Sequence, residues 1–274
     1  MRVADDKESP VTARVETRCD ETTRQITGAD MQVLSERGLP SMKNTVLFDL
    51  GGTLVQYFKR SEFPDILEQA ITEVQNCLRL KGLLSISREA MWRRVRDEDH
   101  EAREYRVRPL EERLVRIFQL DDTVQSSSLI MAICRCFMKP IFARGRCYED
   151  SLPTLQRLRS MGFKMAIVSN TTWGSPAVLW REEIERLGLS EYVDVAVFCR
   201  DVGWRKPARQ IFEFTLEKLQ ALPQHCIFVG DDPRWDLVGA RAVGIEAVFI
   251  DRRGAMHDAG EDPISNLHEL WGRL

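Results

Sequence analysis

Five short apolar runs rich in β-branched residues recur along the chain, and helical periodicity separates the later ones. The first run is Thr-Val-Leu-Phe-Asp at 45–49, and an acid and two glycines end it, which is typical of a buried parallel strand followed by a turn. The other runs lie at 163–168, 193–198, 226–229 and 247–250, with helical stretches at 152–161, 177–187, 208–219 and 235–243. This alternation predicts an α/β fold with a doubly wound parallel sheet covered on both faces. Ligands of such sheets bind beyond the carboxyl ends of the strands.

About a hundred residues separate the first predicted strand from the second, which is too long for a simple crossover. This interval has helical periodicity at 66–80, 88–105, 110–118 and 129–137, with almost no strand signal. We therefore expect residues 58–147, called the cap segment below, to form an inserted all-α cap domain. Residues 43–57 and 148–274 would then form the α/β core.

The first 42 residues contain no Phe, Tyr or Trp, and 14 of the 42 are charged. Such a segment buries too little apolar area to offset the entropy lost on ordering, so we expect a flexible N-terminal tail. The alternative is a short helix at 31–37 that docks on the core.

Composition excludes several classes of protein. The 39 basic and 42 acidic residues leave a net charge of −3, so a globally basic protein that binds nucleic acid is not expected. No apolar run approaches the roughly 20 residues that span a bilayer, and the start of the chain lacks the apolar region of a secretory signal. Seven scattered cysteines fit a reducing compartment. We expect a cytoplasmic protein that binds neither membrane nor nucleic acid; the sequence identifies no protein partner.

Polar residues follow four of the predicted strands. Asp49 comes at the tip of the first and is followed by Gly51, Gly52 and Thr53, so backbone amides can approach an anion beside the carboxylate. The second strand ends in Ser169 and Asn170.

The third and fourth strands are followed by a lysine and by acids. Lys206 directly precedes Pro207, a residue suited to the first turn of a helix. Asp231, Asp232 and Asp236 follow the fourth strand, and clustered carboxylates repel one another unless a cation holds them. Hard oxygen ligands favour Mg²⁺.

In this order the four motifs resemble those of the haloacid dehalogenase superfamily. The flanking residues 148–155 and 239–244 are also similar to this family, and the likeness covers about residues 43 to 255. The resemblance implies a Rossmann-like core with a helical cap, and a phosphatase that acts on a small phosphorylated metabolite through an aspartyl-phosphate.

The resemblance also implies roles for individual residues. Asp49 would be the nucleophile, and Lys206 would neutralise the phosphoryl charge and keep Asp49 ionised. Ser169, Asn170 and the backbone at Gly52 and Thr53 would bind the phosphoryl group. Asp49, Asp231, the carbonyl of residue 51, and Asp236 or Asp232 would hold Mg²⁺.

One position departs from the family pattern. Phosphatases of this family usually carry a second aspartate two residues after the nucleophile as the general acid, and here that position is Gly51. General acid–base catalysis is typically worth about 10²–10⁴ in rate. Two alternatives therefore stay open: a hydrolytic dehalogenase, which works without Mg²⁺ and without this acid, and a catalytically weakened binding protein. The acid cluster favours phosphoryl chemistry.

Other residues have two interpretations at this stage. Asp236 could cap a helix instead of binding metal, and Asp232 could be peripheral. The arginine-rich stretch from Arg93 to Arg108 is interleaved with acids, which is typical of a solvated helix face, although one or two arginines could instead grip an anionic substrate. Trp173 and Trp204, beside the motifs, could line the cleft or pack under the cap.

Overall fold

The computed structural model describes residues 43–98, 104–122, 125–252, 254 and 262–274. The predictions for residues 1–42 lie outside the described residues. Within the described part of the chain, no helix combines the length and the apolarity that a membrane span requires.

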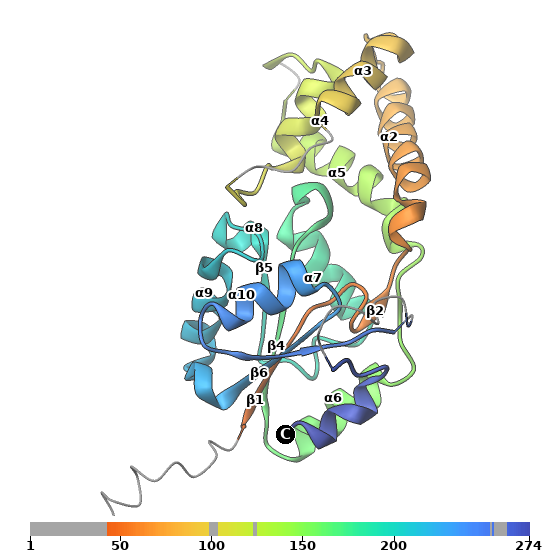
Figure 1. The fold of residues 1–274 in the computed structure, drawn as a ribbon. Helices are drawn as coiled ribbons and strands as arrows, with labels where there is room; N and C mark the ends of the chain where they lie inside the picture. The colour runs from red at the N-terminus through yellow and green to blue at the C-terminus, as the bar shows by residue number, and fades with distance from the viewer. Residues whose placement is uncertain (1–42, 99–103, 123–124, 253, 255–261) are drawn as a thin grey trace, which may run out of the picture. The chain divides into compact units, whose positions relative to one another are not determined.

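The core is built on a five-stranded sheet in which every neighbouring pair of strands is parallel (Figure 1). The strand order is β5-β4-β1-β6-β7. The strands are β1 (Thr45–Phe48), β4 (Lys164–Ser169), β5 (Val195–Phe198), β6 (Cys226–Gly230) and β7 (Glu246–Phe249). The predicted α/β class and doubly wound sheet are confirmed. β4 and β5 lie on one side of β1, and β6 and β7 lie on the other. The carboxyl end of β1 is therefore at the point where the strand order changes direction, which is where such sheets bind ligands.

Alternate residues of the central strands enter two different apolar clusters, one on each face of the sheet. Val46 and Phe48 belong to a cluster with α6 (Ser151–Ser160) and α7 (Ala177–Arg186). Leu47 belongs to the opposite cluster, which includes residues of α9 (Arg209–Leu219) and α10 (Val238–Arg241). Both faces are therefore covered by helices, as continuous apolar strands require.

Short elements complete the core. They are η3 (Thr172–Gly174), α8 (Cys199–Val202), η4 (Pro223–His225), η5 (Pro233–Leu237) and η6 (Leu267–Gly272). The helix expected over 235–243 is in fact the π-helical turn η5 followed by the short α10.

Among its described residues, the cap segment contains four α-helices, which lie together in Figure 1. They are α2 (Phe63–Leu80), α3 (Arg88–Glu98), α4 (Leu110–Phe118) and α5 (Ser127–Phe142), with the 3-10 turn η1 (Arg60–Glu62) before them. Buried residues of α2, α4 and α5 belong to the same apolar cluster as one face of the sheet. α5 contacts the core directly, since Phe137 stacks on Trp173 and Phe142 meets Trp180. The strand β2 (Val55–Gln56) precedes the segment and pairs antiparallel with β3 (Arg146–Cys147) at its end.

The helix expected over 88–105 does not reach Tyr105, and residues 99–103 lie outside the described residues. In the described residues α3 ends at Glu98, and Tyr105 has a left-handed φ of 56°. After Tyr105 the chain pairs with the core: the amide of Val107 donates to the carbonyl of Gly203 at 3.1 Å, and the amide of Arg205 donates to the carbonyl of Tyr105 at 2.8 Å. This backbone pairing joins the cap segment to the loop that precedes Lys206.

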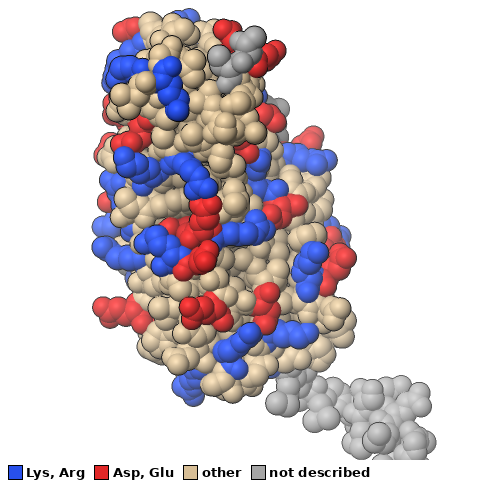
Figure 2. Space-filling view, turned by 180° about the vertical axis from the view of Figure 1, so that it is seen from behind, with Lys and Arg blue, Asp and Glu red and all other residues tan. Residues whose placement is uncertain are grey.

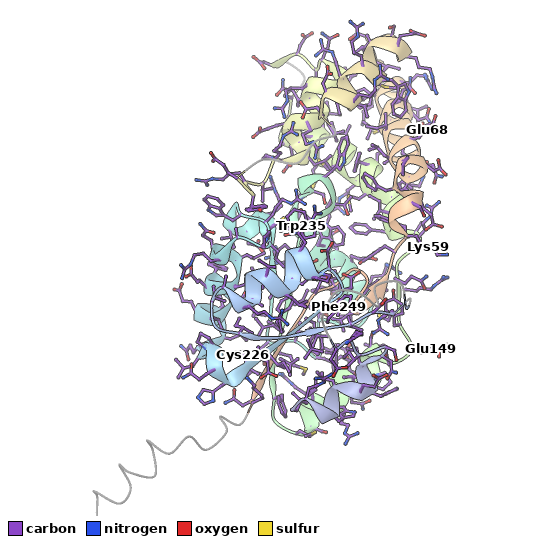
Figure 3. The ribbon with its side chains drawn as sticks, in the orientation of Figure 1. Lys59, Glu68, Glu149, Cys226, Trp235 and Phe249 are labelled. Carbon is purple, nitrogen blue, oxygen red and sulfur yellow. The ribbon has the colours of Figure 1, made fainter. Side chains whose placement is uncertain are left out.

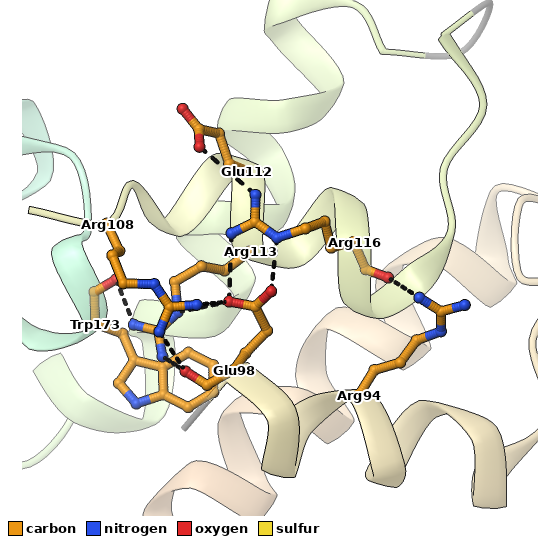
Figure 4. Close-up of polar contacts among 7 residues, drawn as sticks. All are labelled: Arg94, Glu98, Arg108, Glu112, Arg113, Arg116 and Trp173. Carbon is orange, nitrogen blue, oxygen red and sulfur yellow. Dashed lines mark hydrogen bonds and ion pairs between the residues drawn. The ribbon is translucent and has the colours of Figure 1, made fainter. Parts of the chain in front are cut away.

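Several of the arginines converge on Glu98 (Figure 4). The carboxylate of Glu98 forms ion pairs with Arg108, with Arg113 and with Nε of Arg116, the last at 2.6 Å. Burial alone would raise the pKa of Glu98, but the Arg116 hydrogen bond and the three guanidinium charges outweigh it and lower the pKa. These ion pairs join the end of α3 to α4 and to Arg108, which is the one of the three arginines that belongs to the stretch from Arg93 to Arg108. Glu98 is buried and Arg108 is not helical, so at Arg108 the structure does not show the solvated helix face expected for this stretch.

Basic and acidic side chains are interspersed over the face shown in Figure 2. This mixture agrees with the near-balanced charge of the chain.

Candidate active site

The carboxylate of Asp49 lies directly after β1 and contacts residues from two other strand ends. Its Oδ1 accepts a hydrogen bond from the hydroxyl of Ser169 at 3.2 Å and one from Nζ of Lys206 at 2.5 Å. Asp49 is 7% exposed, so the carboxylate is nearly withdrawn from bulk solvent while it still lines a cavity. An anion this buried is stabilised chiefly by the lysine beside it.

Lys206 is held rigidly between acids and an amide. Its side chain is 2% exposed, and its Nζ also forms an ion pair with Oδ1 of Asp236 at 2.6 Å. The side chain of Asn170 accepts from the backbone amide of Lys206 at 2.8 Å and donates to its carbonyl at 3.3 Å. Burial works to lower the pKa of Lys206, but Asp236 and Asp49 raise it by more, so the ammonium stays charged.

Three carboxylates crowd together at this end of the sheet. Oxygen atoms of Asp49, Asp231 and Asp236 all lie within 4.8 Å of one another. Burial and the charges of its neighbours, with Asp49 first among them, raise the pKa of Asp231 well above its usual range. Burial raises the pKa of Asp236 to about 6, although Lys206 opposes this shift. One lysine does not neutralise three acids, and the oxygen donors suit a hard divalent cation such as Mg²⁺.

The backbone beside the cluster is shaped to let Asp231 approach closely. Gly52 has a φ of +87°, and a Cβ atom placed there would lie 2.0 Å from Oδ2 of Asp231. A glycine is therefore required at this position by both conformation and space.

The structure separates the roles of Asp232 and Asp236. Oδ1 of Asp232 accepts from the amides of Arg234 and Trp235 at 2.9 and 3.3 Å, which makes Asp232 the N-cap of η5. Asp236 does not cap a helix; its Oδ2 accepts from the amide of Asp232 at 3.1 Å, and its other oxygen faces Lys206. Of these two acids, Asp236 is the one that lies in the carboxylate cluster of the described residues.

These groups line a cavity of about 1020 Å³. The polar residues that were expected at the site and line the cavity are Asp49, Ser169, Asn170, Lys206, Asp231, Asp232 and Asp236, together with the backbone of Gly51 and Gly52. Thr53 is different: its side chain is fully buried, and it is not among the described residues that line the cavity.

Aromatic residues form much of the remaining wall, and the sequence did not indicate them. They are Tyr57, Phe58, Phe63, Trp180 and Trp235. Figure 3 labels Trp235, which lies between α10 and the cap helices. Its ring is nearly perpendicular to that of Tyr105, with the ring centres 5.8 Å apart. Arg234 also lines the cavity, with its guanidinium 3.9 Å from the centre of the Trp235 ring. Only the closeness of Tyr57 and Phe58 to the Asp49 motif could have pointed to this wall.

The two tryptophans that flank the motifs pack against the cap segment. The ring of Trp173 stacks on Phe137 at 5.4 Å and lies under the guanidinium of Arg113 at 3.7 Å. Arg106 lies 3.8 Å above the ring of Trp204. In the described part of the chain, the cavity wall includes neither tryptophan.

This arrangement defines a class of protein: a parallel α/β core with a buried lysine and an acid cluster at the carboxyl ends of its strands. Residues 43–244 match the family of haloacid dehalogenase-like hydrolases, and the chain belongs to that family.

Curated relatives include both phosphatases and a dehalogenase. The chain is 36% identical over 102 residues to a ribulose-1,5-bisphosphate 5-phosphatase of Halopiger xanaduensis, which covers 37% of this chain and 41% of that protein. It is 27% identical over 186 residues to a phosphoserine phosphatase of Thermus thermophilus, covering 67% and 72%. It is also 30% identical to (S)-2-haloacid dehalogenase 4A of Burkholderia cepacia, covering 46% and 54%. The match spans about two fifths of the length of the first of these relatives.

Solved structures give the same family. An HAD phosphatase from Thermococcus onnurineus is 29% identical, with a TM-score of 0.60 over 85% of this chain and 97% of that one. The named phosphatases among the relatives support a hydrolase of phosphatase type.

Proposed function

We propose that the chain is a Mg²⁺-dependent phosphomonoester hydrolase that acts on a small phosphorylated metabolite through an aspartyl-phosphate. The observation that carries this proposal is the buried contact of Lys206 with Asp49 inside a cluster of three carboxylates. Release of a halide ion does not need a cluster of acids. A phosphate dianion repels an anionic nucleophile, so attack on it needs a cation beside the two anions. The cytoplasmic location expected from the sequence belongs to the same proposal.

In the first step a carboxylate oxygen of Asp49 attacks phosphorus. An O–P bond forms, the bond from phosphorus to the ester oxygen breaks, and the leaving group takes the electron pair. Lys206 keeps Asp49 ionised and offsets charge on the phosphoryl oxygens, and Ser169 with the amide of Asn170 donates hydrogen bonds to them. Water then attacks the aspartyl-phosphate, which releases inorganic phosphate and restores Asp49.

Asp49, Asp231 and Asp236, with the carbonyl of Gly51, would hold the metal. Bound Mg²⁺ offsets negative charge as the carboxylate and the phosphoryl group approach each other. Asp232 is the weaker candidate for this role because its Oδ1 already caps η5.

The experiment is phosphate release from a panel of phosphate esters by the wild type and by Asp49→Asn, each with Mg²⁺ and with EDTA. We expect turnover only by the wild type with Mg²⁺. Asp65→Asn, in the first turn of α2, is the matched control and should behave as wild type. Absence of Mg²⁺-dependent turnover across the panel would refute the proposal, and halide release from a haloacid that persists in EDTA would favour the dehalogenase.

A second candidate is a catalytically weakened protein that binds a phosphorylated metabolite. The observation that favours it is Gly51, which has no side chain to protonate a leaving group. Binding of a phosphate ester by Asp49→Asn, with no turnover by the wild type, would support this candidate.

A further inference from the structure

The space beside Gly51 is filled by an aromatic ring. A Cβ atom on Gly51 would lie 3.6 Å from Cδ2 and 3.9 Å from Cε2 of Tyr57, at ordinary van der Waals distance. The side chain beside Gly51, two residues after Asp49, is therefore the phenol ring of Tyr57 and not a carboxyl group.

Aromatic side chains continue from this ring along the cavity. Tyr57 meets Trp180 edge-on with ring centres 5.7 Å apart, and Phe58 lies 5.8 Å from Phe63. All four rings line the cavity that contains Asp49. A substrate whose phosphoryl group sits on Asp49 must place its remaining atoms in this cavity, where flat apolar groups gain most from contact with aromatic rings.

The carboxyl groups that line the cavity already have other contacts, so none of them is placed as a proton donor for the leaving group. Among the described lining residues, the acids are Asp49, Asp231 and Asp236, which form the cluster around Lys206, and Asp232, which caps η5. The hydroxyl of Tyr57 is buried and has no hydrogen-bond partner among the described residues. Burial, and then the charge of Glu183, raise the pKa of this hydroxyl, which makes it a weaker acid than an ordinary phenol.

The chemistry of the leaving group follows from this distribution. An alkyl ester must expel an alkoxide, a strong base that departs readily only when an acid protonates it. A phenol has a pKa of about 10, so a phenolate departs without that help. A site without a committed proton donor discriminates strongly between these two classes of ester.

We propose that the site is specialised for phosphate monoesters of phenols, whose phenolate leaves unprotonated and whose ring packs among Tyr57, Phe58, Phe63 and Trp180. This inference rests on the proposed phosphatase function and names its substrate class.

The test compares esters that separate leaving-group basicity from aromatic packing. With saturating Mg²⁺, kcat/KM is measured for phenyl, benzyl and cyclohexylmethyl phosphate. Phenyl and benzyl phosphate share a ring, but only benzyl phosphate must expel an alkoxide. We expect phenyl phosphate to exceed benzyl phosphate by at least about 100-fold, the lower range of a missing general acid. We also expect KM for benzyl phosphate to be several-fold below that for cyclohexylmethyl phosphate.

A ratio of phenyl to benzyl phosphate below about 10, or equal KM values for the two alkyl esters, would overturn this inference and leave the phosphatase proposal intact. Absence of Mg²⁺-dependent turnover on all three esters would overturn both.

One variant tests whether the hydroxyl of Tyr57 acts as a proton donor, and a second variant is its control. Tyr57→Phe should leave the phenyl-to-benzyl ratio unchanged within about threefold, since the ring is kept and only the hydroxyl is lost. Tyr192→Phe, outside the described wall of the cavity, is the control for loss of a phenol hydroxyl. A tenfold loss by Tyr57→Phe that is confined to benzyl phosphate would make Tyr57 the proton donor and overturn the inference.

Discussion

The side-chain nitrogen of Lys206 lies 2.5 Å from Oδ1 of Asp49, and both side chains are less than 10% exposed. Lys206→Met removes the positive charge that faces Asp49 and Asp236 while it keeps most of the side-chain volume. We expect kcat/KM for phosphate esters to fall by about 10²–10³, as for loss of one electrostatic stabiliser in other enzymes. Steady-state kinetics with saturating Mg²⁺ measures this change.

The same variant leaves buried carboxylates without their partner. Loss of one member of a buried ion pair costs about 3–5 kcal/mol, so the free energy of unfolding in EDTA should fall by that order in urea titrations. Lys218→Met, at an exposed position on α9, is the control and should change neither quantity. Wild-type kinetics for Lys206→Met would contradict the role given to this lysine.

Gly51→Asp tests whether a carboxyl at this position restores protonation of the leaving group. The added Cβ has room, since the nearest atom is Cδ2 of Tyr57 at 3.6 Å. We expect kcat for benzyl phosphate to rise by at least about tenfold, with little change for phenyl phosphate. Gly51→Asn has nearly the same shape without the acid and should not show this rise; an equal effect of both variants would exclude an acid–base explanation.

Glu98→Gln tests the network that holds the cap helices together. The side chain of Glu98 is 11% exposed and pairs with Arg108, Arg113 and Arg116. Hydrogen bonds to charged groups contribute about 1.5–3 kcal/mol, and we expect a loss of about 2 kcal/mol in the free energy of unfolding. Glu112→Gln is the matched control: its side chain is 63% exposed, its contact with Arg116 is 3.6 Å, and a surface pair of this kind contributes about 0–1 kcal/mol.

The same network predicts a pH dependence. Because the pKa of Glu98 is lowered in the folded protein, the network contributes its full stability above the ordinary glutamate pKa of 4.5 and loses it as pH falls through the folded value. The difference in stability between wild type and Glu98→Gln should therefore shrink below pH 4.5. A difference that stays constant on acidification would contradict the ion-pair explanation.

Gly145→Ala tests the packing behind Tyr57. A Cβ atom at Gly145 would lie 2.5 Å from Oε1 of Glu183 and 2.8 Å from Cε1 of Tyr57. Overpacking of this kind costs about 1–3 kcal/mol, which a thermal or urea unfolding curve would detect. Gly272→Ala meets nothing within 4 Å and should be neutral; equal effects of the two substitutions would show that the contact has no consequence.

The sheet was predictable because each buried parallel strand is a continuous apolar run. The run expected at 163–168, for example, is the strand Lys164–Ser169. The path of the chain at Tyr105 and Arg106 was not predictable, because the charged periodicity continues to Tyr105. What the chain does there depends on a distant loop: Arg106 pairs with Trp204, a contact that local propensity does not encode.

The polar half of the site was predictable for a topological reason. Asp49, Ser169 and Asp231 each lie at the carboxyl end of a strand of one parallel sheet, so their side chains had to meet at one edge. The aromatic half was not predictable: Tyr57 and Trp180 are more than a hundred residues apart, and neither belongs to a motif. Thr53 shows the converse, since it lies within a motif and yet its side chain is fully buried outside the cavity wall of the described residues.

The cap segment is inserted at a ladder of two residue pairs, in which Val55 faces Cys147 and Gln56 faces Arg146. Antiparallel partners lie about 5 Å apart, so the chain leaves the core and returns to it at neighbouring points. A two-residue hairpin turn spans such a gap. The core can therefore accept an insert of a different length that covers the same apolar surface, with no change in the path of its own strands. The inserted segment can therefore vary while the residues at the strand ends keep their places.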